Sequence, residues 1–446
     1  MSLTCAACGL GVGAVAANAA NDHSFTSSFS GAGTNAVSGP TDVAVDDVTH
    51  DVYVLDSGNA RVEKFDNAGN FLLSWGGGVV ASGPDNVPVN ERQRVTVHAT
   101  GGTFTLTAEG HTTAEIPFDA SAAAVQVALE DLPNIQAGNV KVTEAEGAPS
   151  NGGSWDVEFT GSLADTNIQE MATDGSHLTG EPPIITHSTT VEGAGSYEIC
   201  DPAKGDVCRT GIPGNGPGQF TTPQFIAVDN SNSESAGDVY VADTNNSGVS
   251  KFDSSGNLIT SWGTGGQIHT HEPLGIAVDT NGNLVTLDTF AKIEKFAPFG
   301  ELISAIQSQG DPQRAGITLD GNGNIYFVNQ NIIREHDYVE VSSPEGKRIG
   351  PVTGPGYTGP TEGLVFAPFT GDLYVDDGGN SVLHYDSNCD PSAGECTPVD
   401  SFGAGHLAGA GGLAVDPGTD TVYAADTTGG SIVVFNGALA HVTTGT

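Results

Sequence analysis

Oxygen-bearing side chains recur at one position of a repeated pattern, and together they have the chemistry to bind a hard cation. Each follows a mainly apolar run, of which Val52–Leu55 is the first. Aligning these runs places six residues at the same position: Asp56, Asp243, Asp288, Asn329, Asp377 and Asp426. If the runs are strands that converge on one channel mouth, the ring of carboxylates is a predicted calcium site.

The alternative interpretation is that each of these residues caps the turn that follows its own run. Aspartate side chains commonly accept hydrogen bonds from the backbone of turns. We favour this alternative, because the same residue in every copy is what a repeated structural need produces.

Positions at which the copies differ are better candidates for a functional site, since function usually breaks the symmetry of a repeat. In each copy another buried apolar run comes first, and in five of the six copies a polar or aromatic residue that differs from copy to copy stands near its start: Asp42, Phe225, His271, Arg314 and Glu362. We predict that these five side chains line one mouth and bind a ligand. If the protein is an enzyme, the candidates for catalysis are His271, Arg314 and Glu362.

The histidine pair of the third copy is a weak metal signal. His269 and His271 alternate along an extended segment, so their side chains share one face. Two histidines fall short of the three protein ligands of a catalytic zinc site, and a surface pair is the commoner interpretation. Gly-x-Ser-x-Gly and His-Glu-x-x-His motifs are also absent from the sequence. We therefore prefer a non-catalytic binding or structural role over the alternative, a metal-dependent lyase or hydrolase.

Six cysteines fall into three close pairs: Cys5/Cys8, Cys200/Cys208 and Cys389/Cys396. The second and third pairs each enclose Asp-Pro and a glycine, which predicts turns pinned by disulfides. Zinc would require two pairs at C-x₂₋₄-C spacing, and these loops are longer. Local disulfides indicate an oxidising compartment, so we expect an exported protein that is extracellular or on the cell surface. The role of Cys5/Cys8 stays open.

The charge of the chain limits its partners. With 54 acidic and 14 basic residues, the formal net charge is −40. Nucleic-acid binding depends on clustered Lys and Arg, so a protein, peptide or glycan is the expected partner. No apolar run reaches the length of about 18 residues that a membrane span needs. Residues 1–20 are small and apolar but lack a basic start, so a signal peptide is a weak interpretation, and we expect a flexible N-terminal segment at 1–23.

Four short strands must position these residues, and the group of four recurs about every 40–50 residues. The first copy comprises Asp42–Asp46, Val52–Asp56, Arg61–Asp66 and Phe71–Gly76. Six copies separated by turn residues predict an all-β fold, a six-bladed β-propeller with sheets arranged around an axis. Phe25–Gly31 reads as an outer strand without a blade of its own, and we expect it to complete the sixth blade and close the ring.

The repeated residues resemble the NHL repeat family of β-propellers. The likeness rests on Ile-Ala-Val-Asp at 226–229 and 276–279 and on Tyr-Val-Ala-Asp at 240–243, and it covers residues 24–84 and 197–444. It is looser in the fifth copy, where Ala367 replaces the Asp. The resemblance implies a propeller module of an exported bacterial surface protein. Some NHL enzymes hold zinc with a histidine from each of three blades, but only the third copy offers one here.

A long insertion separates the first two copies. Asp46 and Asp229 end equivalent strands but lie 183 residues apart, where about 45 would suffice. Within residues 85–196, alternating segments such as 94–98 and 155–160 predict strands. Residues 119–130 predict a helix that is capped by Asp119 or Ser121. We therefore expect a small α+β domain at 85–196, between a first blade at 24–84 and blades two to six at 197–446.

Overall fold

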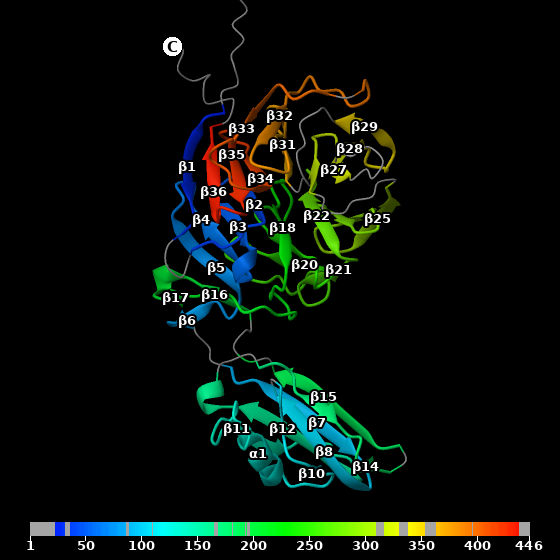
Figure 1. The fold of residues 1–446 in the computed structure, drawn as a ribbon. Coiled ribbons are helices and arrows are strands. Elements are labelled where there is room, and N and C mark those ends of the chain that lie inside the picture. The colour runs from blue at the N-terminus through cyan, green and yellow to red at the C-terminus, as the bar shows by residue number, and fades with distance from the viewer. Residues whose placement is uncertain are drawn as a thin grey trace, which may run out of the picture.

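The computed structural model of the chain consists almost entirely of antiparallel strands (Figure 1). It describes residues 23–31, 36–85, 89–108, 110–164, 168–180, 182–191, 193, 197–308, 316–329, 338–352, 363–394 and 396–436. The predicted N-terminal segment therefore lies outside the described residues, except for His23. Among the described residues, no helix combines the length and the hydrophobicity needed to cross a membrane.

Six sheets of this structure are the blades of a β-propeller, each named here by the copy that forms it. Blade 1 contains β2 (Asp42–Val45), β3 (Val52–Asp56), β4 (Arg61–Phe65), β5 (Phe71–Gly77) and β16 (Tyr197–Cys200). Blade 2 contains β18 (Pro223–Val228), β19 (Val239–Asp243), β20 (Gly248–Phe252) and β21 (Gln267–His269). Blade 3 contains β22 (Pro273–Val278), β23 (Leu284–Asp288), β24 (Lys292–Phe296) and β25 (Leu302–Gln307).

The remaining three blades follow the same order from the inner to the outer strand. Blade 4 contains β26 (Ile317–Leu319), β27 (Ile325–Asn329), β28 (Tyr338–Ser342) and β29 (Arg348–Val352). Blade 5 contains β30 (Leu364–Phe366), β31 (Leu373–Asp376), β32 (Val382–Tyr385) and β33 (Asp400–Phe402). Blade 6 contains β34 (Ala410–Asp416), β35 (Thr421–Asp426), β36 (Ser431–Phe435) and β1 (Phe25–Phe29).

The inner strands form a closed ring. Each contacts the inner strands of the two neighbouring blades, and β34 of the last blade contacts β2 of the first. The N-terminal strand β1 pairs antiparallel with β36, with Phe29 opposite Ile432. Two segments from opposite ends of the chain therefore make one sheet, which removes the exposed edge that an open ring would leave.

Apolar side chains fill the spaces between neighbouring blades. Buried residues of blades 1 and 2 pack together, among them Tyr53, Trp75 and Val241. A second cluster joins blade 6 to blade 1 and includes Val54, Phe65 and Val434. Because one four-stranded sheet cannot cover both of its own faces, each blade depends on its neighbours for a core.

Blade 2 differs from the sequence prediction at its fourth strand. Leu258–Gly263 has the sequence pattern of the fourth strand of the first copy, Phe71–Gly76, but β21 at Gln267–His269 pairs with β20 instead. Leu258 makes only an isolated bridge to Phe252, after which the chain turns through glycines with positive φ at 263, 265 and 266. Trp262 is nevertheless buried against Tyr240, with ring centroids 5.5 Å apart. The aromatic side chain keeps its packing role although its backbone is not in a strand.

Residues between β5 and β16 form two further sheets with a core of their own. One has the order β11 (Val140–Glu144), β12 (Gly152–Phe159), β7 (Arg92–His98), β15 (Ile184–Val191). The other centres on β8 (Gly101–Ala108), which pairs with β9 (His111–Thr112), β10 (Ile116–Pro117), β13 (Ala172–Asp174) and β14 (Leu178–Thr179). The helix α1 (Ala122–Glu130) begins after Ser121, whose hydroxyl accepts a hydrogen bond from the Ala124 amide. Of the two predicted caps, Ser121 is therefore the residue used.

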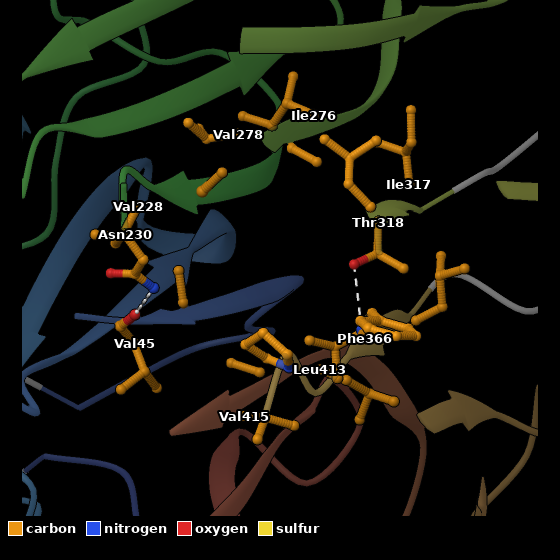
Figure 2. A pocket seen from close by; sticks show the side chains of 18 of the residues that line it. Val45, Val228, Asn230, Ile276, Val278, Ile317, Thr318, Phe366, Leu413 and Val415 are labelled. Carbon is orange, nitrogen blue, oxygen red and sulfur yellow. Dashed lines mark hydrogen bonds between the residues drawn. The ribbon is translucent and has the colours of Figure 1, made fainter. Parts of the chain in front are cut away.

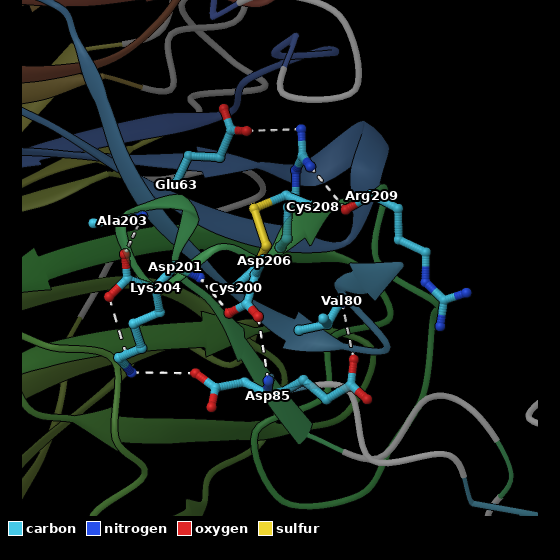
Figure 3. Close-up of a disulfide and its surroundings, with 12 residues drawn as sticks. Glu63, Val80, Asp85, Cys200, Asp201, Ala203, Lys204, Asp206, Cys208 and Arg209 are labelled. Atoms are coloured by element: carbon cyan, nitrogen blue, oxygen red, sulfur yellow. Dashed lines mark hydrogen bonds and ion pairs between the residues drawn. A yellow bond between two sulfur atoms is a disulfide. The ribbon is translucent and has the colours of Figure 1, made fainter. Parts of the chain in front are cut away.

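The chain leading out of blade 1 and the chain returning to it run side by side (Figure 3). β16 pairs with β5 as a fifth strand that the sequence did not predict, and β17 (Val207–Cys208) pairs with β6 (Val80–Ser82). A disulfide between Cys200 and Cys208 links the returning segment to itself, and a second joins Cys389 to Cys396. Both predicted disulfides are confirmed, whereas Cys5 and Cys8 lie outside the described residues.

Candidate functional site: the central channel

The inner strands enclose a cavity of about 390 Å³ on the axis of the propeller (Figure 2). All six contribute aliphatic or aromatic side chains to its wall, including Val45, Val228, Val278, Ile317, Phe366 and Val415. Because each inner strand is the edge of its own sheet, the channel is walled by strand edges as well as by side chains. We call the mouth at which the inner strands begin the leading mouth, and the mouth at which they end the trailing mouth.

Polar side chains inside the channel tie neighbouring blades together. The amide of Asn230 donates to the carbonyl of Val45 at 2.9 Å, which joins blade 2 to blade 1. The hydroxyl of Thr318 accepts a hydrogen bond of 3.2 Å from the backbone amide of Phe366, which joins blade 4 to blade 5 (Figure 2). These two side chains therefore serve the wall, and the interior is largely apolar.

The trailing mouth carries an unusual carboxylate, that of Asp47. Three acidic residues line the channel near this mouth, but Asp279 pairs with Lys295 at 2.6 Å and Asp320 accepts hydrogen bonds from two backbone amides. Among the described residues, no cationic side chain pairs with the Asp47 carboxylate, which accepts a hydrogen bond from its own backbone amide. Burial raises the pKa of Asp47, and the neighbouring charge of Asp46 raises it further.

The rim of the trailing mouth is also apolar. Val48 and Phe369 follow the lining residues Asp47 and Pro368, and their side chains are 80% and 72% exposed. Large exposed apolar side chains beside a cavity are typical of a ligand or partner site.

The leading mouth holds two of the residues that the sequence predicted for ligand binding. Asp42 and Phe225 line the channel. The carboxylate of Asp42, however, accepts hydrogen bonds of 2.9 Å from the amides of Val43 and Ile226, so it joins blade 1 to blade 2.

Of the other three predicted residues, the described part of the structure places only His271, which lies away from the channel lining. His271 does not line the cavity; its ring lies 4.2 Å from that of Phe290, and its Nδ1 lies 3.2 Å from the hydroxyl of Thr289. Arg314 and Glu362 lie outside the described residues. The proposed set of His271, Arg314 and Glu362 thus stays untested as a catalytic group.

The aspartates of the predicted ring all accept backbone hydrogen bonds, but Asp56 makes no side-chain cap to the turn that follows it. Asp243 accepts hydrogen bonds from the amides of Thr221 and Thr222, and Asp426 accepts them from those of Gly409 and Gly429. The carboxylates of the remaining three predicted residues likewise accept backbone hydrogen bonds: Asp56, Asp288 and Asp377. Calcium binding by these residues stays a prediction, while the hydrogen bonds of Asp288, Asp377 and Asp426 with the turns that follow them support the turn-capping interpretation.

Burial and hydrogen bonding act on these carboxylates in opposite directions. Burial raises the pKa of Asp243, and the backbone amides that point at the carboxylate oppose the rise. Burial also raises the pKa of Asp56, while the positive charge of Arg61 lowers it. The carboxylates of Asp243 and Asp56 therefore interact with groups of their own blades.

Sequence reasoning missed one cluster of ionisable groups. In the part of the chain that the structure describes, His23, His384 and Asp400 are the only group of three potential ligands close enough together to hold a metal ion. The signal available in the sequence was His384, which stands where blades 1, 2 and 3 have Lys64, Lys251 and Lys295. This is the kind of asymmetry that separates a site from a repeated scaffold.

Comparison with known families supports the NHL resemblance at one repeat. The NHL repeat model matches residues 38–65, which span β2 to β4. No curated protein sequence matches the chain.

Solved structures with some similarity include two lyases. A streptogramin B lyase is 11% identical over 90% of this chain and 94% of its own, with a TM-score of 0.42. The virginiamycin B lyase of Staphylococcus aureus is 12% identical over 90% of this chain and 95% of its own, with a TM-score of 0.41. A protein of unknown function from Bacteroides caccae is 15% identical over 52% of this chain and 78% of its own, with a TM-score of 0.38. Identities and TM-scores this low say nothing about the activity of this chain.

Proposed function

We propose that the protein is a non-catalytic binding module of an exported protein, and that its ligand is a peptide segment with apolar and basic side chains. The observation that supports this most directly is the apolar channel, whose trailing mouth carries the carboxylate of Asp47, a group that pairs with no cationic side chain of the described residues. An apolar side chain would occupy the channel, and an ammonium or guanidinium group would pair with Asp47.

Two further properties support a basic peptide over the other partners that the composition allows. The net charge of −40 attracts cationic ligands over a distance and repels nucleic acid. The wall of the channel is mainly aliphatic, which suits the side chains of a peptide better than a glycan, whose polar hydroxyls would need partners. Export is supported by the two disulfides.

Binding of fluorescent peptides tests the proposal. Peptides that combine Leu or Phe with Lys or Arg are compared with acidic peptides and with neutral oligosaccharides. We expect only the apolar basic peptides to bind, with Asp47→Lys weakening the affinity about tenfold or more, because it places a positive charge at the mouth. Ala277→Phe, which adds a ring to the channel wall, should also abolish binding.

Glu301→Lys is the matched control, since it makes the same charge change at an exposed position outside the channel. It should leave the affinity close to that of the unaltered protein. Equal loss in Asp47→Lys and Glu301→Lys would reduce the effect to net charge and would refute the channel as the site. Binding of oligosaccharides alone would refute the peptide ligand.

We also propose that residues 85–196 form an inserted domain between blades 1 and 2. It is supported by a hydrophobic core that includes Val95, Trp155 and Leu129 and that contains no propeller residue. Limited proteolysis should cleave first near residues 85 and 196, leaving fragments that resist further digestion. Cleavage that begins inside 92–191 would contradict these boundaries.

A further inference from the structure

Two imidazoles and a carboxylate meet where blade 5 contacts the closing strand of the ring. His23 lies two residues before β1, His384 is on β32, and Asp400 begins β33. One potential ligand atom from each residue lies within 4.8 Å of the other two. Both histidine side chains are fully buried, whereas that of Asp400 is 31% exposed.

The inner nitrogens of both rings face Asp400. Nδ1 of His384 lies 3.1 Å from one carboxylate oxygen, and Nδ1 of His23 lies 3.7 Å from the other. The second distance is too long for a hydrogen bond, and this buried nitrogen has no hydrogen-bond partner in the described structure. A buried nitrogen without a partner costs free energy unless something absent from the protein chain satisfies it.

The outer nitrogens lie beside polar groups of the kind that metal-bound histidines usually contact. Nε2 of His23 lies 3.1 Å from the hydroxyl of Tyr374, whereas Nε2 of His384 lies at an ion-pair distance of 3.3 Å from the carboxylate of Asp372 without hydrogen-bond geometry. Such outer contacts fix the ring orientation and leave the other nitrogen free to bind a metal. Phe402 stacks on His23 at 4.4 Å between ring centroids and holds that ring further.

Blades 1 and 2 show what the repeat normally places at this position. There Lys64 pairs with Asp51 at 2.8 Å, and Lys251 pairs with Asp238 at 3.0 Å. Each ammonium group also donates to a backbone carbonyl of the next blade and lies over the ring of a tyrosine equivalent to Tyr374.

In blade 5 the chain keeps the aspartate and the tyrosine but replaces the lysine with His384. His23 then stands on the side of the next blade, so two imidazoles occupy the place of one ammonium group. A lysine would suffice if this position only joined neighbouring blades. Its replacement by His384 therefore points to a different bound cation.

We propose that His23, His384 and Asp400 bind a divalent transition-metal ion of the zinc class, through the two Nδ1 atoms and the carboxylate. These are nitrogen and oxygen ligands that zinc accepts, and the partial exposure of Asp400 leaves room for water as a fourth ligand. With both imidazoles neutral, Asp372 and Asp400 leave two negative charges that one divalent ion balances.

The ion would fasten the N-terminal strand to the ring. Two of its ligands belong to blade 5 and the third precedes β1, the strand that completes blade 6. A ligand that binds only the folded protein stabilises it in proportion to the logarithm of its concentration. The site is therefore structural and separate from the channel, and it would be present whether or not the channel binds a peptide.

A proton on His384 is the alternative to a metal ion at this site. Burial lowers the pKa of His384, but interactions with Asp372 and Asp400 outweigh it and raise the pKa to about 9 in the metal-free protein. A protonated His384 would also reduce the negative charge of the cluster. The experiment must therefore separate metal binding from an ion-pair network.

Metal binding is measured on the full chain after treatment with a chelator and dialysis. Zinc or cobalt(II) is added back, bound metal is quantified by mass spectrometry, and the visible absorption of cobalt reports its ligand geometry. We expect one equivalent of metal, a higher melting temperature with zinc, and cobalt absorption typical of nitrogen and oxygen ligands. His23→Ala should lose all three properties.

His384→Lys is the decisive variant, because it restores the residue of blades 1 and 2 and should fold without a metal ligand at this position. We expect it to be stable, to bind no metal and to melt at the same temperature with or without zinc. His50→Ala is the matched control, since His50 pairs with Asp416 at 3.0 Å at another blade junction without a second histidine. It should keep the bound metal.

Absence of stoichiometric metal in the unaltered chain would overturn the proposal and leave a proton-linked ion-pair network. Equal metal binding by the unaltered protein, His23→Ala and His384→Lys would place the ion elsewhere and would also overturn it. Peptide binding at the channel should be the same in His384→Lys and in the unaltered protein, so the two proposals can fail separately.

Discussion

The hydroxyl of Thr244 donates a hydrogen bond of 2.8 Å to the carbonyl of Pro273, and this contact joins blade 2 to blade 3. Ser57 makes the same contact with Pro223 at 2.6 Å, between blades 1 and 2. Thr427 makes it with Pro40 at 2.8 Å, between blades 6 and 1. The three hydroxyls directly follow Asp243, Asp56 and Asp426. In each Asp-Ser/Thr pair the aspartate accepts a hydrogen bond from the segment that precedes the first strand of its own blade, and the hydroxyl bonds to the next blade.

Replacing Thr244 with valine should weaken the junction between blades 2 and 3. The variant keeps the shape of the side chain but leaves the carbonyl of Pro273 without this donor, so we expect a loss of about 1–2 kcal/mol in the free energy of unfolding. Chemical denaturation measures it. Thr260→Val, at an exposed threonine, is the control and should change stability by less than about 0.5 kcal/mol. Equal effects of the two variants would contradict a role in joining blades.

Blade 1 contains a buried charge group that makes stability depend on pH. Arg61 is fully buried and lies 2.9 Å from Asp56 and 2.7 Å from Glu63. Burial raises the pKa of Glu63, Arg61 lowers it and Asp56 raises it, and the result is a pKa of about 8. The folded protein therefore holds the proton of Glu63 more tightly than the unfolded chain does.

The sign of the pH dependence follows from this raised pKa. The stabilising contribution of protonated Glu63 is fully present below pH 4.5, its ordinary pKa, and is lost as the pH rises through about 8. Glu63→Gln cannot lose a proton, so the unaltered protein should lose stability relative to this variant by a few kcal/mol (order of magnitude) between pH 5 and pH 9. Denaturation of both proteins at these two pH values measures the difference. A difference that does not change with pH would show that Glu63 titrates normally.

The two disulfides should contribute unequally to stability. They close loops of similar length, with sequence separations of 8 and 7, so their effects on the unfolded chain are nearly equal. Cys200 and Cys208 pack with Val79 and Val80 in a buried cluster, whereas Cys389 and Cys396 are only partly buried.

We expect Cys200→Ser/Cys208→Ser to lose about 3–4 kcal/mol, because it adds two buried hydroxyls to the loss of the crosslink. Cys389→Ser/Cys396→Ser should lose about 2 kcal/mol. Chemical denaturation of the two double variants under oxidising conditions provides the comparison. A greater loss in the second variant would contradict the importance of the buried cluster.

The repeated part of the fold was predictable because the residues that form each turn lie close together in the sequence. Asp66 accepts hydrogen bonds from the amides of Ala68 and Asn70 within its own turn, so a short motif specifies both the turn and the ends of the flanking strands. Pairing of β1 with β36 was also predictable, since an outer strand without a blade has one vacant position in a closed ring.

Features that depend on distant contacts were not predictable. Addition of β16 to blade 1 requires the returning chain to reach β5, and nothing in the local sequence of Tyr197–Cys200 specifies that partner. Among the five residues predicted to bind a ligand, the side chain of Asp42 bonds to the next blade, which only the ring geometry reveals. The neighbourhood of His23 and His384 likewise joins segments that are more than 350 residues apart.

The glycine of the turn between the third and fourth strands packs against the preceding blade. Gly256 has φ +84°, and a methyl group on its Cα would lie 3.0 Å from the ring of Trp75 in blade 1. The corresponding Gly69, Gly300 and Gly346 have equally close neighbours from the blade before. Glycine is needed here for the backbone conformation and also for the close approach of the blades.

Gly256→Ala should therefore destabilise the propeller by about 2–3 kcal/mol, since the cost of a positive φ adds to the displacement of Trp75. Gly405→Ala separates these two effects, because Gly405 has φ +85° and a methyl group there would meet nothing within 4 Å. It should lose only about 1 kcal/mol. Denaturation curves of both variants, followed by tryptophan fluorescence, should show the larger loss and a shifted native emission only for Gly256→Ala. Equal losses would mean that backbone strain alone requires this glycine and that blade packing does not.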